Sequence, residues 1–339
     1  MGNSKVGGFL ASRQRAIPAE QKVSPPSQLR GTVIPDNGPN VKSKYFFQLV
    51  ALSALWGASF MLTRMAAPVL GPSLAAALRM VMATVMLSLI MWQRRTPWPL
   101  RHWKELVLLG LLAVAGPHLL YARSSLDLPA GYGALLTVTS VLFGAFASAW
   151  LKEESLTLPK MLGCLLGFAG AALVVRLGPV EPNHTLVIAA LTCMAGAAVS
   201  GVSTPFLKKA ISRMEPLQIT AGMHAAAVVL MLPGALYDLP GAHFSLRALS
   251  AVMLMGFVTS GLAYWMYMRI MRHVPPMAAL SSTFLSTGFG VLWAVLLLDE
   301  PTSAAMAVGG ALILLACLLV MGLNPLRWRL QTLLDKLQV

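Results

Sequence analysis

The chain has 339 residues, of which 57% are hydrophobic and only 11% are aspartate, glutamate, lysine or arginine. A soluble domain carries about 25% of these charged residues, so this chain has too few to cover a water-facing surface. Its net charge of +14 does not indicate a nucleic-acid partner, because the basic residues lie in short loops between long apolar runs. The composition therefore predicts a protein whose surroundings are a lipid bilayer.

The two ends of the chain differ from the apolar part between them. Residues 1–44 contain Pro25-Pro26, scattered serine, glycine and basic residues, and no apolar periodicity, which predicts a disordered cytoplasmic tail. Residues 323–339 are apolar on one face and basic near their start. This pattern predicts a cytoplasmic amphipathic tail that lies on the membrane surface.

Ten apolar segments lie between the two tails, and each has about the 20 residues that a spanning helix needs. They are residues 45–65, 72–92, 104–122, 129–150, 157–177, 185–207, 216–237, 246–268, 275–298 and 302–322. Proline lies near the start of six of them, where its missing N–H removes no helical hydrogen bond. The fold class predicted is an all-α integral membrane protein with ten transmembrane helices.

The basic residues divide the connecting loops into two sets. Sixteen lysines and arginines lie in one set of alternate loops, whereas the other set holds only Arg64, Arg123, Arg176 and Arg247. Basic loops stay in the cytoplasm, so we expect a multi-pass protein of the inner (plasma) membrane with both termini cytoplasmic. An even number of spans also requires that the two termini share a side.

The sequence contains an internal repeat. The segment SVLFGAFASAWLKEES, from Ser140 to Ser155, is echoed 146 residues later by STGFGVLWAVLLLDEP, from Ser286 to Pro301. The same offset relates Gly110 to Gly256. Two copies of one five-helix unit are therefore expected.

These copies predict two repeats, residues 45–178 and 185–322. An offset of 144 residues relates their first helices, as Gly57 and Gly201 illustrate. Because five is odd, the second copy enters the membrane from the opposite side, which gives an inverted-topology repeat of the kind found in secondary transporters. Two near-equal halves make the inward-open and outward-open states close in energy.

The five-plus-five arrangement, the segment LWGASFMLTR in the first helix and the Glu-x8-Gly pattern that closes each half resemble the EamA-type transporters of the drug/metabolite transporter superfamily. The resemblance runs from about Tyr45 to Gly322. It implies a secondary transporter that exports a small-molecule substrate, often an amino acid. It implies no particular substrate and supplies no catalytic signature.

Candidate residues for a substrate cavity are aromatic, polar or charged side chains deep in the predicted helices. They are Trp56, Ser59, Phe60, Arg79, His118, Ser140, Ser203, Tyr264, Trp265, Ser282 and Ser286. For the hydroxyls the alternative is hydrogen bonding between helices. As a set, on helices of both halves, they predict a mildly polar central cavity.

Arg79 lies about seven residues into its helix, a depth at which a charge usually faces protein or water. It either attracts a substrate carboxylate or extends its side chain to the headgroups. No aspartate or glutamate lies at comparable depth in the sequence, so no carboxylate proton relay is expected.

Two interruptions occupy nearly equivalent places, Gly116-Pro117 in one half and Ser260-Gly261 in the other. Broken segments at matching places in two repeats are the best sequence indication of a binding site. His118 and Tyr264 follow them closely, although aromatic residues near helix ends also form interfacial belts. His118 and His224 either carry a proton or, more commonly, bond a backbone carbonyl.

Glu154 and Glu300, the acids that the repeat shares, each precede a helix. They either form a gate at each mouth or stabilise the positive end of the helix that follows. The glycines Gly163, Gly167 and Gly170 predict close helix packing, within the chain or in a homodimer.

Two rival classes are an intramembrane enzyme and a membrane sensor that signals through residues 1–44. No His-Glu-x-x-His motif occurs, and no nucleophile stands with a base at catalytic spacing, so we expect no catalytic residue. Cys164, Cys193 and Cys317 lie in apolar runs without metal-ligand spacing, so we expect neither a metal nor a cofactor.

Overall fold

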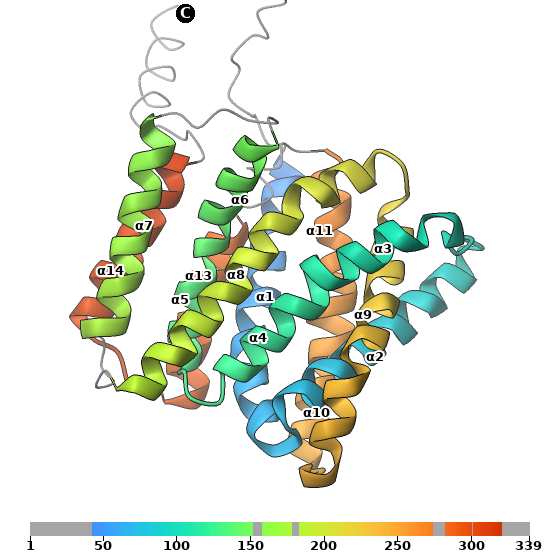
Figure 1. Cartoon of the computed structure of the whole chain (residues 1–339), viewed down its shortest axis with the longest axis horizontal. Helices are drawn as coiled ribbons and strands as arrows, with labels where there is room; N and C mark the ends of the chain where they lie inside the picture. The colour runs from blue at the N-terminus through green and yellow to red at the C-terminus, as the bar shows by residue number, and fades with distance from the viewer. Residues whose placement is uncertain (1–42, 152–157, 178–182, 274–281, 300, 321–339) are drawn as a thin grey trace, which may run out of the picture. The chain divides into compact units, whose positions relative to one another are not determined.

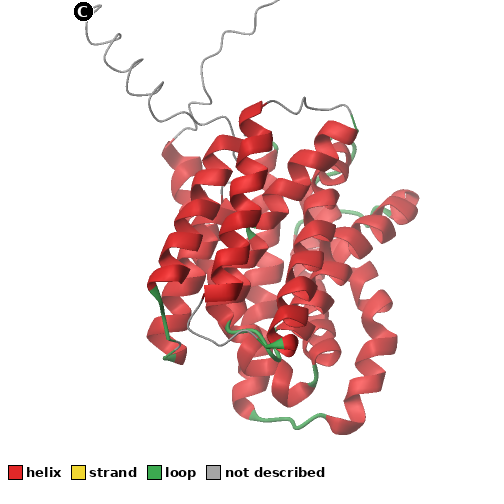
Figure 2. Ribbon diagram, turned by 60° about the vertical axis from the view of Figure 1, so that its left-hand side comes forward, coloured by secondary structure: helices red, strands yellow, loops and turns green. Residues whose placement is uncertain are grey.

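The structure is a computed structural model that describes residues 43–151, 158–177, 183–273, 282–299 and 301–320. Every regular element in these ranges is a helix (Figures 1 and 2). The predictions for the two tails therefore lie outside the described residues, except that Ser43 and Lys44, expected in the disordered tail, begin helix α1. Those for Glu154 and Glu300 do too.

Helices occupy the described part of each apolar segment. In the first half they are α1 (Ser43–Leu70), α2 (Pro72–Gln93), η1 (Leu100–His102), α3 (Trp103–Leu109), η2 (Gly110–Ala115), α4 (Gly116–Ser124), α5 (Ala130–Thr137), α6 (Thr139–Trp150) and α7 (Leu158–Leu177). In the second half they are α8 (His184–Ile211), α9 (Pro216–Asp238), η3 (Leu239–Gly241), α10 (Leu246–Leu254), η4 (Met255–Leu262), α11 (Ala263–Met271), α13 (Ser282–Leu298) and α14 (Ala304–Val320).

Among the described residues, seven helical stretches are long and apolar enough to cross a membrane. They are Phe47–Leu70, Pro72–Gln93, Leu100–Ser124, Ala130–Trp150, His184–Ile211, Pro216–Gly241 and Leu246–Met271. Leu285–Leu298 and Ala304–Ala316 are shorter apolar helices. The prolines behave as predicted at the starts of α2 and α9, because Pro72 and Pro216 occupy the first helical position of each.

Two stretches are built as α-helix, π-helix and α-helix in succession. The π-helix η2 joins α3 to α4, and η4 joins α10 to α11. η2 ends just before Gly116-Pro117, and η4 contains Ser260-Gly261. The interruptions predicted from the sequence are therefore wide helical turns rather than breaks, as is common at functional sites.

Equivalent glycines of the two halves make equivalent helix contacts. A Cβ atom on Gly57 of α1 would lie 2.8 Å from the backbone nitrogen of Gly290 of α13. A Cβ atom on Gly201 of α8 would lie 2.8 Å from the backbone nitrogen of Gly144 of α6. The first helix of each predicted copy thus packs against the fourth helix of the other copy, backbone to backbone.

Two further helix pairs join the predicted copies: α2 packs with α9, and α7 packs with α14 (Figure 1). In the second pair, a Cβ atom on Gly170 would lie 2.7 Å from the carbonyl oxygen of Gly309. A Cβ atom on Gly167 would lie 3.3 Å from the Cβ of Ala316. These two glycines therefore serve packing within the chain.

The end of α9 caps the start of α2. Asp238 accepts hydrogen bonds at Oδ2 from the backbone nitrogens of Ser73 at 2.6 Å and Leu74 at 3.3 Å. Gly71, the residue before α2, has a φ of 88°, which only glycine adopts without strain. The carboxylate thus satisfies N–H groups that the first turn of α2 leaves free and complements its positive end.

Candidate functional site

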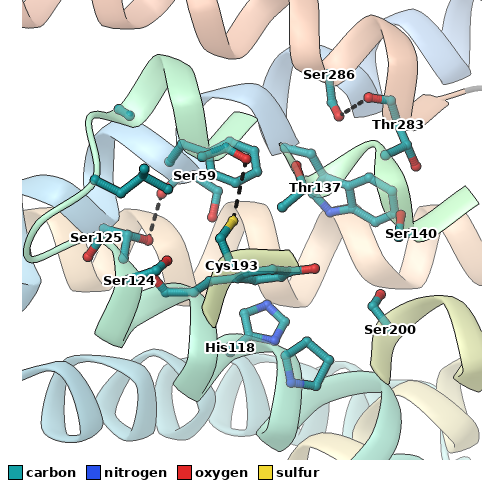
Figure 3. Close-up of a pocket in the computed structure, with 18 of the residues that line it drawn as sticks. Ser59, His118, Ser124, Ser125, Thr137, Ser140, Cys193, Ser200, Thr283 and Ser286 are labelled. Atoms are coloured by element: carbon teal, nitrogen blue, oxygen red, sulfur yellow. Dashed lines mark hydrogen bonds between the residues drawn. The ribbon is translucent and has the colours of Figure 1, made fainter. Parts of the chain in front are cut away.

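A cavity of about 150 Å³ lies among helices of both halves (Figure 3). Its walls come from α1, α2, η2, α4, α5, α6, α8, α11 and α13. Eight of the eleven candidate residues line it: Trp56, Ser59, Phe60, Arg79, His118, Ser140, Tyr264 and Ser286. The sequence pattern therefore brought together side chains that do meet in space.

Three candidates do not line this cavity. Ser203 is buried and donates a hydrogen bond to the carbonyl oxygen of Ser200 at 2.6 Å. Ser282 is buried at the start of α13, where its carbonyl oxygen accepts a hydrogen bond from Ser53 at 2.9 Å. In place of Ser203, Ser200 faces the cavity one turn earlier on α8.

Trp265 is the third exception. Its indole ring lies in a separate, basic pocket, where the guanidinium carbons of Arg94 and Arg269 are 5.0 and 5.5 Å from the ring centroid. Successive residues of a helix point about 100° apart, so Trp265 turns away from the cavity that Tyr264 faces. The prediction that both rings line one cavity was wrong.

The lining also includes residues that the candidate set omitted. They are Thr63, Ala113, Pro117, Tyr121, Ser124, Ser125, Leu128, Pro129, Ala130, Gly133, Thr137, Cys193, Ser200 and Thr283. Cys193 has a detectable signal, because it precedes Ser200 by two helical turns and so shares its face. Its thiol lies 3.8 Å from the carbonyl oxygen of Gly133 (Figure 3).

Arg79 supplies a charge to the cavity wall. Its side chain is only 7% exposed, so it does not extend to the headgroup region. Nε donates a hydrogen bond to the hydroxyl of Ser260, and Nη2 donates one to the hydroxyl of Thr259 at 3.2 Å. The third contact is Nη1 to the sulfur of Met255, at 4.0 Å. All three partners are uncharged and belong to the π-helix η4.

Two aromatic side chains of the cavity are fixed by the π-helices. Trp56 Nε1 donates a hydrogen bond to the carbonyl oxygen of Thr259 in η4 at 3.1 Å. The hydroxyl of Tyr264 donates one to the carbonyl oxygen of Ala113 in η2 at 3.0 Å. Ala113 and Thr259 are 146 residues apart, which is the offset of the predicted repeat.

The acceptor at Ala113 has a cause in the sequence. In an α-helix its carbonyl would accept the N–H four residues later, but that residue is Pro117, which has none. The ring centroids of Trp56 and Tyr264 are 5.8 Å apart, so the two side chains form one aromatic wall.

Known proteins resemble this chain along most of its length. Residues 44–176 and residues 187–322 each match the EamA-like transporter family. The chain belongs to that family. The family is part of the drug/metabolite transporter superfamily, as the sequence motifs predicted, and with its apolar helices it makes this chain a multi-pass membrane protein.

Three relatives of this EamA-like chain are named as uncharacterized transporters. Transporter YvbV of Bacillus subtilis (strain 168) is 25% identical over 290 residues, which cover 82% of this chain and 92% of the relative. Two proteins of Archaeoglobus fulgidus are 21% and 23% identical and are covered to 98% and 94%. A solved crystal structure shares the fold, with a TM-score of 0.61, 21% identity and coverage of 82% of this chain and 97% of the other.

The two deep histidines of this EamA-like chain bond to backbone carbonyls, as the commoner alternative predicted. His118 Nδ1 lies 2.7 Å from the carbonyl oxygen of Val114, and His224 Nδ1 lies 2.7 Å from that of Thr220. A carbonyl only accepts, so Nδ1 carries the hydrogen and Nε2 presents a lone pair. Within the described part of the chain, Nε2 of the buried His224 has no hydrogen-bond partner.

The loop between α4 and α5 forms one end of the cavity of this EamA-like chain. Ser125, Leu128 and Pro129 line it there, and Arg64 of α1 donates hydrogen bonds from Nη1 to the carbonyl oxygens of Ser125 and Leu126, the latter at 2.7 Å. Lys208, which the predicted repeat makes the counterpart of Arg64, is exposed and makes no hydrogen bond within the described residues.

Proposed function

We propose that this chain is a secondary transporter that exports a small metabolite, such as an amino acid, across the cytoplasmic membrane by alternating access of two inverted repeats. The repeats are residues 45–178 and 185–322, with both termini in the cytoplasm. The observation that carries the proposal is the cavity, because both halves line it and its walls combine aromatic rings, hydroxyls and one guanidinium.

The repeat is supported by contacts as well as by sequence. Gly57 meets α13 as Gly201 meets α6, and the carbonyls of Ala113 and Thr259 each accept a hydrogen bond from a cavity aromatic. Matching contacts are what a pseudo-two-fold axis in the membrane plane produces. The separate family matches at residues 44–176 and 187–322 agree with two copies.

Alternating access requires two states of similar energy that expose the same site to opposite sides. Arg64 bonds the loop at the end of the cavity that the basic-loop pattern assigns to the outside. Release of these bonds would open the cavity to the outside. Closure of the cytoplasmic end, on the side of Lys208, would accompany it. Contacts that match in the two halves would keep the two states close in energy.

The experiment that tests the proposal is uptake by proteoliposomes containing the purified full chain. Labelled amino acids, quaternary amines and nucleosides are supplied with and without a pH gradient. Trp56→Phe removes an indole that lines the cavity, whereas Trp265→Phe removes one that lies outside it and serves as the matched control.

Saturable uptake of one class that falls in Trp56→Phe and persists in Trp265→Phe would support transport through this cavity. Comparison of uptake with and without the pH gradient then decides whether protons are coupled to transport. Absence of uptake for every class, from protein whose folding is verified by its unfolding transition, would count against the proposed function.

A further inference from the structure

We propose that Arg79 binds the carboxylate of the transported compound, and that the substrates are amphipathic organic carboxylates in which an amino group is not required. The inference rests on the proposed transport function and narrows its substrate class. It combines three observations: a buried guanidinium with uncharged partners, a lining without acids, and an aromatic wall on α1 and α11.

The first observation concerns charge. Arg79 is 93% buried, and its contacts are two hydroxyls and a thioether. None of the described residues that line the cavity is an aspartate or a glutamate. A buried cation without a counterion is unfavourable, because it has left water without gaining an opposite charge. An anionic group entering the cavity would supply that charge.

The second observation concerns the free donors of the guanidinium. An arginine has five N–H groups in a planar fork, and the hydroxyls of Ser260 and Thr259 engage only Nε and Nη2. Thr259 Oγ1 also lies 3.0 Å from the carbonyl oxygen of Met255, so its own hydrogen points there and its lone pairs face Arg79. The η4 hydroxyls thus hold one edge of the guanidinium and leave further N–H groups for a carboxylate, which pairs with such a fork in bidentate fashion.

The third observation concerns the remainder of the ligand. The rings of Trp56, Phe60, Tyr121 and Tyr264 line the same cavity, and they favour an apolar body. The described lining offers an ammonium group no carboxylate; its side-chain acceptors include hydroxyls, aromatic faces and the lone pair of His118 Nε2. The carboxylate is therefore the group that decides binding, and a zwitterion binds no better than the matching acid.

The test is direct binding to the purified full chain in detergent, measured by saturation-transfer NMR at constant ionic strength. The probes are 3-phenylpropionate, its neutral amide 3-phenylpropionamide, phenylalanine and chloride. We expect 3-phenylpropionate to bind at least about tenfold more tightly than the amide, since a charge-assisted hydrogen bond gives a factor of this size. Phenylalanine should not bind more tightly than 3-phenylpropionate.

Three variants test whether Arg79 causes the preference for the acid over the amide. Arg79→Gln should bind acid and amide equally, Arg79→Lys should keep a weaker preference for the acid, and Arg247→Gln, an exposed arginine outside the cavity, should behave as the wild type. The wild-type comparison of acid with amide stands even where a variant folds poorly.

Equal binding of acid and amide by the wild type would overturn the proposal, as would a preference that persists in Arg79→Gln. Chloride that displaces 3-phenylpropionate at equal concentration would also overturn it, because the site would then be one for inorganic anions. Failure of the proposed transport function would give another result. The Arg79-dependent preference for the acid would remain in the binding experiment, while proteoliposomes would take up none of the probes.

Discussion

The hydroxyl of Tyr264 donates a hydrogen bond of 3.0 Å to the carbonyl oxygen of Ala113, across the boundary between the two predicted repeats. Pro117 makes this acceptor available, because it has no N–H to offer the carbonyl four residues before it. A helix irregularity in one half thereby fixes a cavity side chain of the other half. The bond between Trp56 and Thr259 makes the same connection in the opposite direction.

Removing the Tyr264 hydroxyl should therefore destabilise the protein. In Tyr264→Phe the Ala113 carbonyl loses its partner inside the membrane, at a cost of about 1–3 kcal/mol. The midpoint of thermal unfolding in detergent should fall. Tyr237→Phe is the matched control because Tyr237 is 87% exposed, and an equal effect of the two substitutions would contradict the role given to the Tyr264 bond.

The crossing of α1 and α13 should not accept a side chain at Gly57. A Cβ atom there would lie 2.7 Å from Phe289 Cβ and 2.8 Å from backbone nitrogen of Gly290, so Gly57→Ala should cost about 1–3 kcal/mol through overpacking. Gly288→Ala, also in this crossing pair, meets no atom within 4 Å and should leave the unfolding midpoint unchanged or raise it. If both variants unfold at the wild-type temperature, the backbones do not approach as closely as described.

Asp238 should contribute more to the stability of the folded protein than an ordinary surface acid does. Asp238→Ala removes the acceptor of two N–H groups at the start of α2, and loss of such a cap costs about 0.5–2 kcal/mol. Asp127→Ala removes only an exposed ion pair with Arg123, 3.7 Å long, which is worth about 0–1 kcal/mol. Thermal unfolding of the two variants should separate them, and similar midpoints would refute the cap.

Arg64 should control access to the cavity from the α4–α5 loop. Cys193 lines the cavity and is 1% exposed, so it reports entry of a small maleimide in a background carrying Cys164→Ser and Cys317→Ser. Arg64→Met frees the loop carbonyls and should speed labelling at least about tenfold, since each bond to a charged donor contributes about 1.5–3 kcal/mol. Arg247→Met should label like its parent, and an unchanged rate in Arg64→Met would show that another contact holds this end shut.

The sequence predicted the helices and much of the cavity because both depend on local pattern. Apolar length identified the segments, and prolines such as Pro72 and Pro216 marked their starts. Polar and aromatic residues at helical spacing, such as Trp56 with Ser59 and Phe60, gave the correct face of α1. These features require no knowledge of which helices are neighbours.

Other features depended on geometry that a pattern does not carry. A π-helix adds a residue to a turn and so rotates everything after it by about 100° relative to an α-helix, which is why periodicity could not decide between Tyr264 and Trp265. The cap between Asp238 and α2 joins residues 165 positions apart. The bonds from Arg64 go to backbone carbonyls, an acceptor that every residue has and that no residue type indicates.

The exchange of partners between the halves bears on how the protein is made. α1 leaves the ribosome long before α13, the helix that Gly57 meets, so during synthesis its glycine face lies against lipid or a temporary neighbour. The contact between this glycine face and α13 forms only when residues 282–298 have been inserted. A ribosome that stalls before α13 leaves a fragment whose α1 glycine face has no partner, which quality-control proteases can recognise. For the same reason, the two halves should accumulate as separate polypeptides only when both are produced in the same cell.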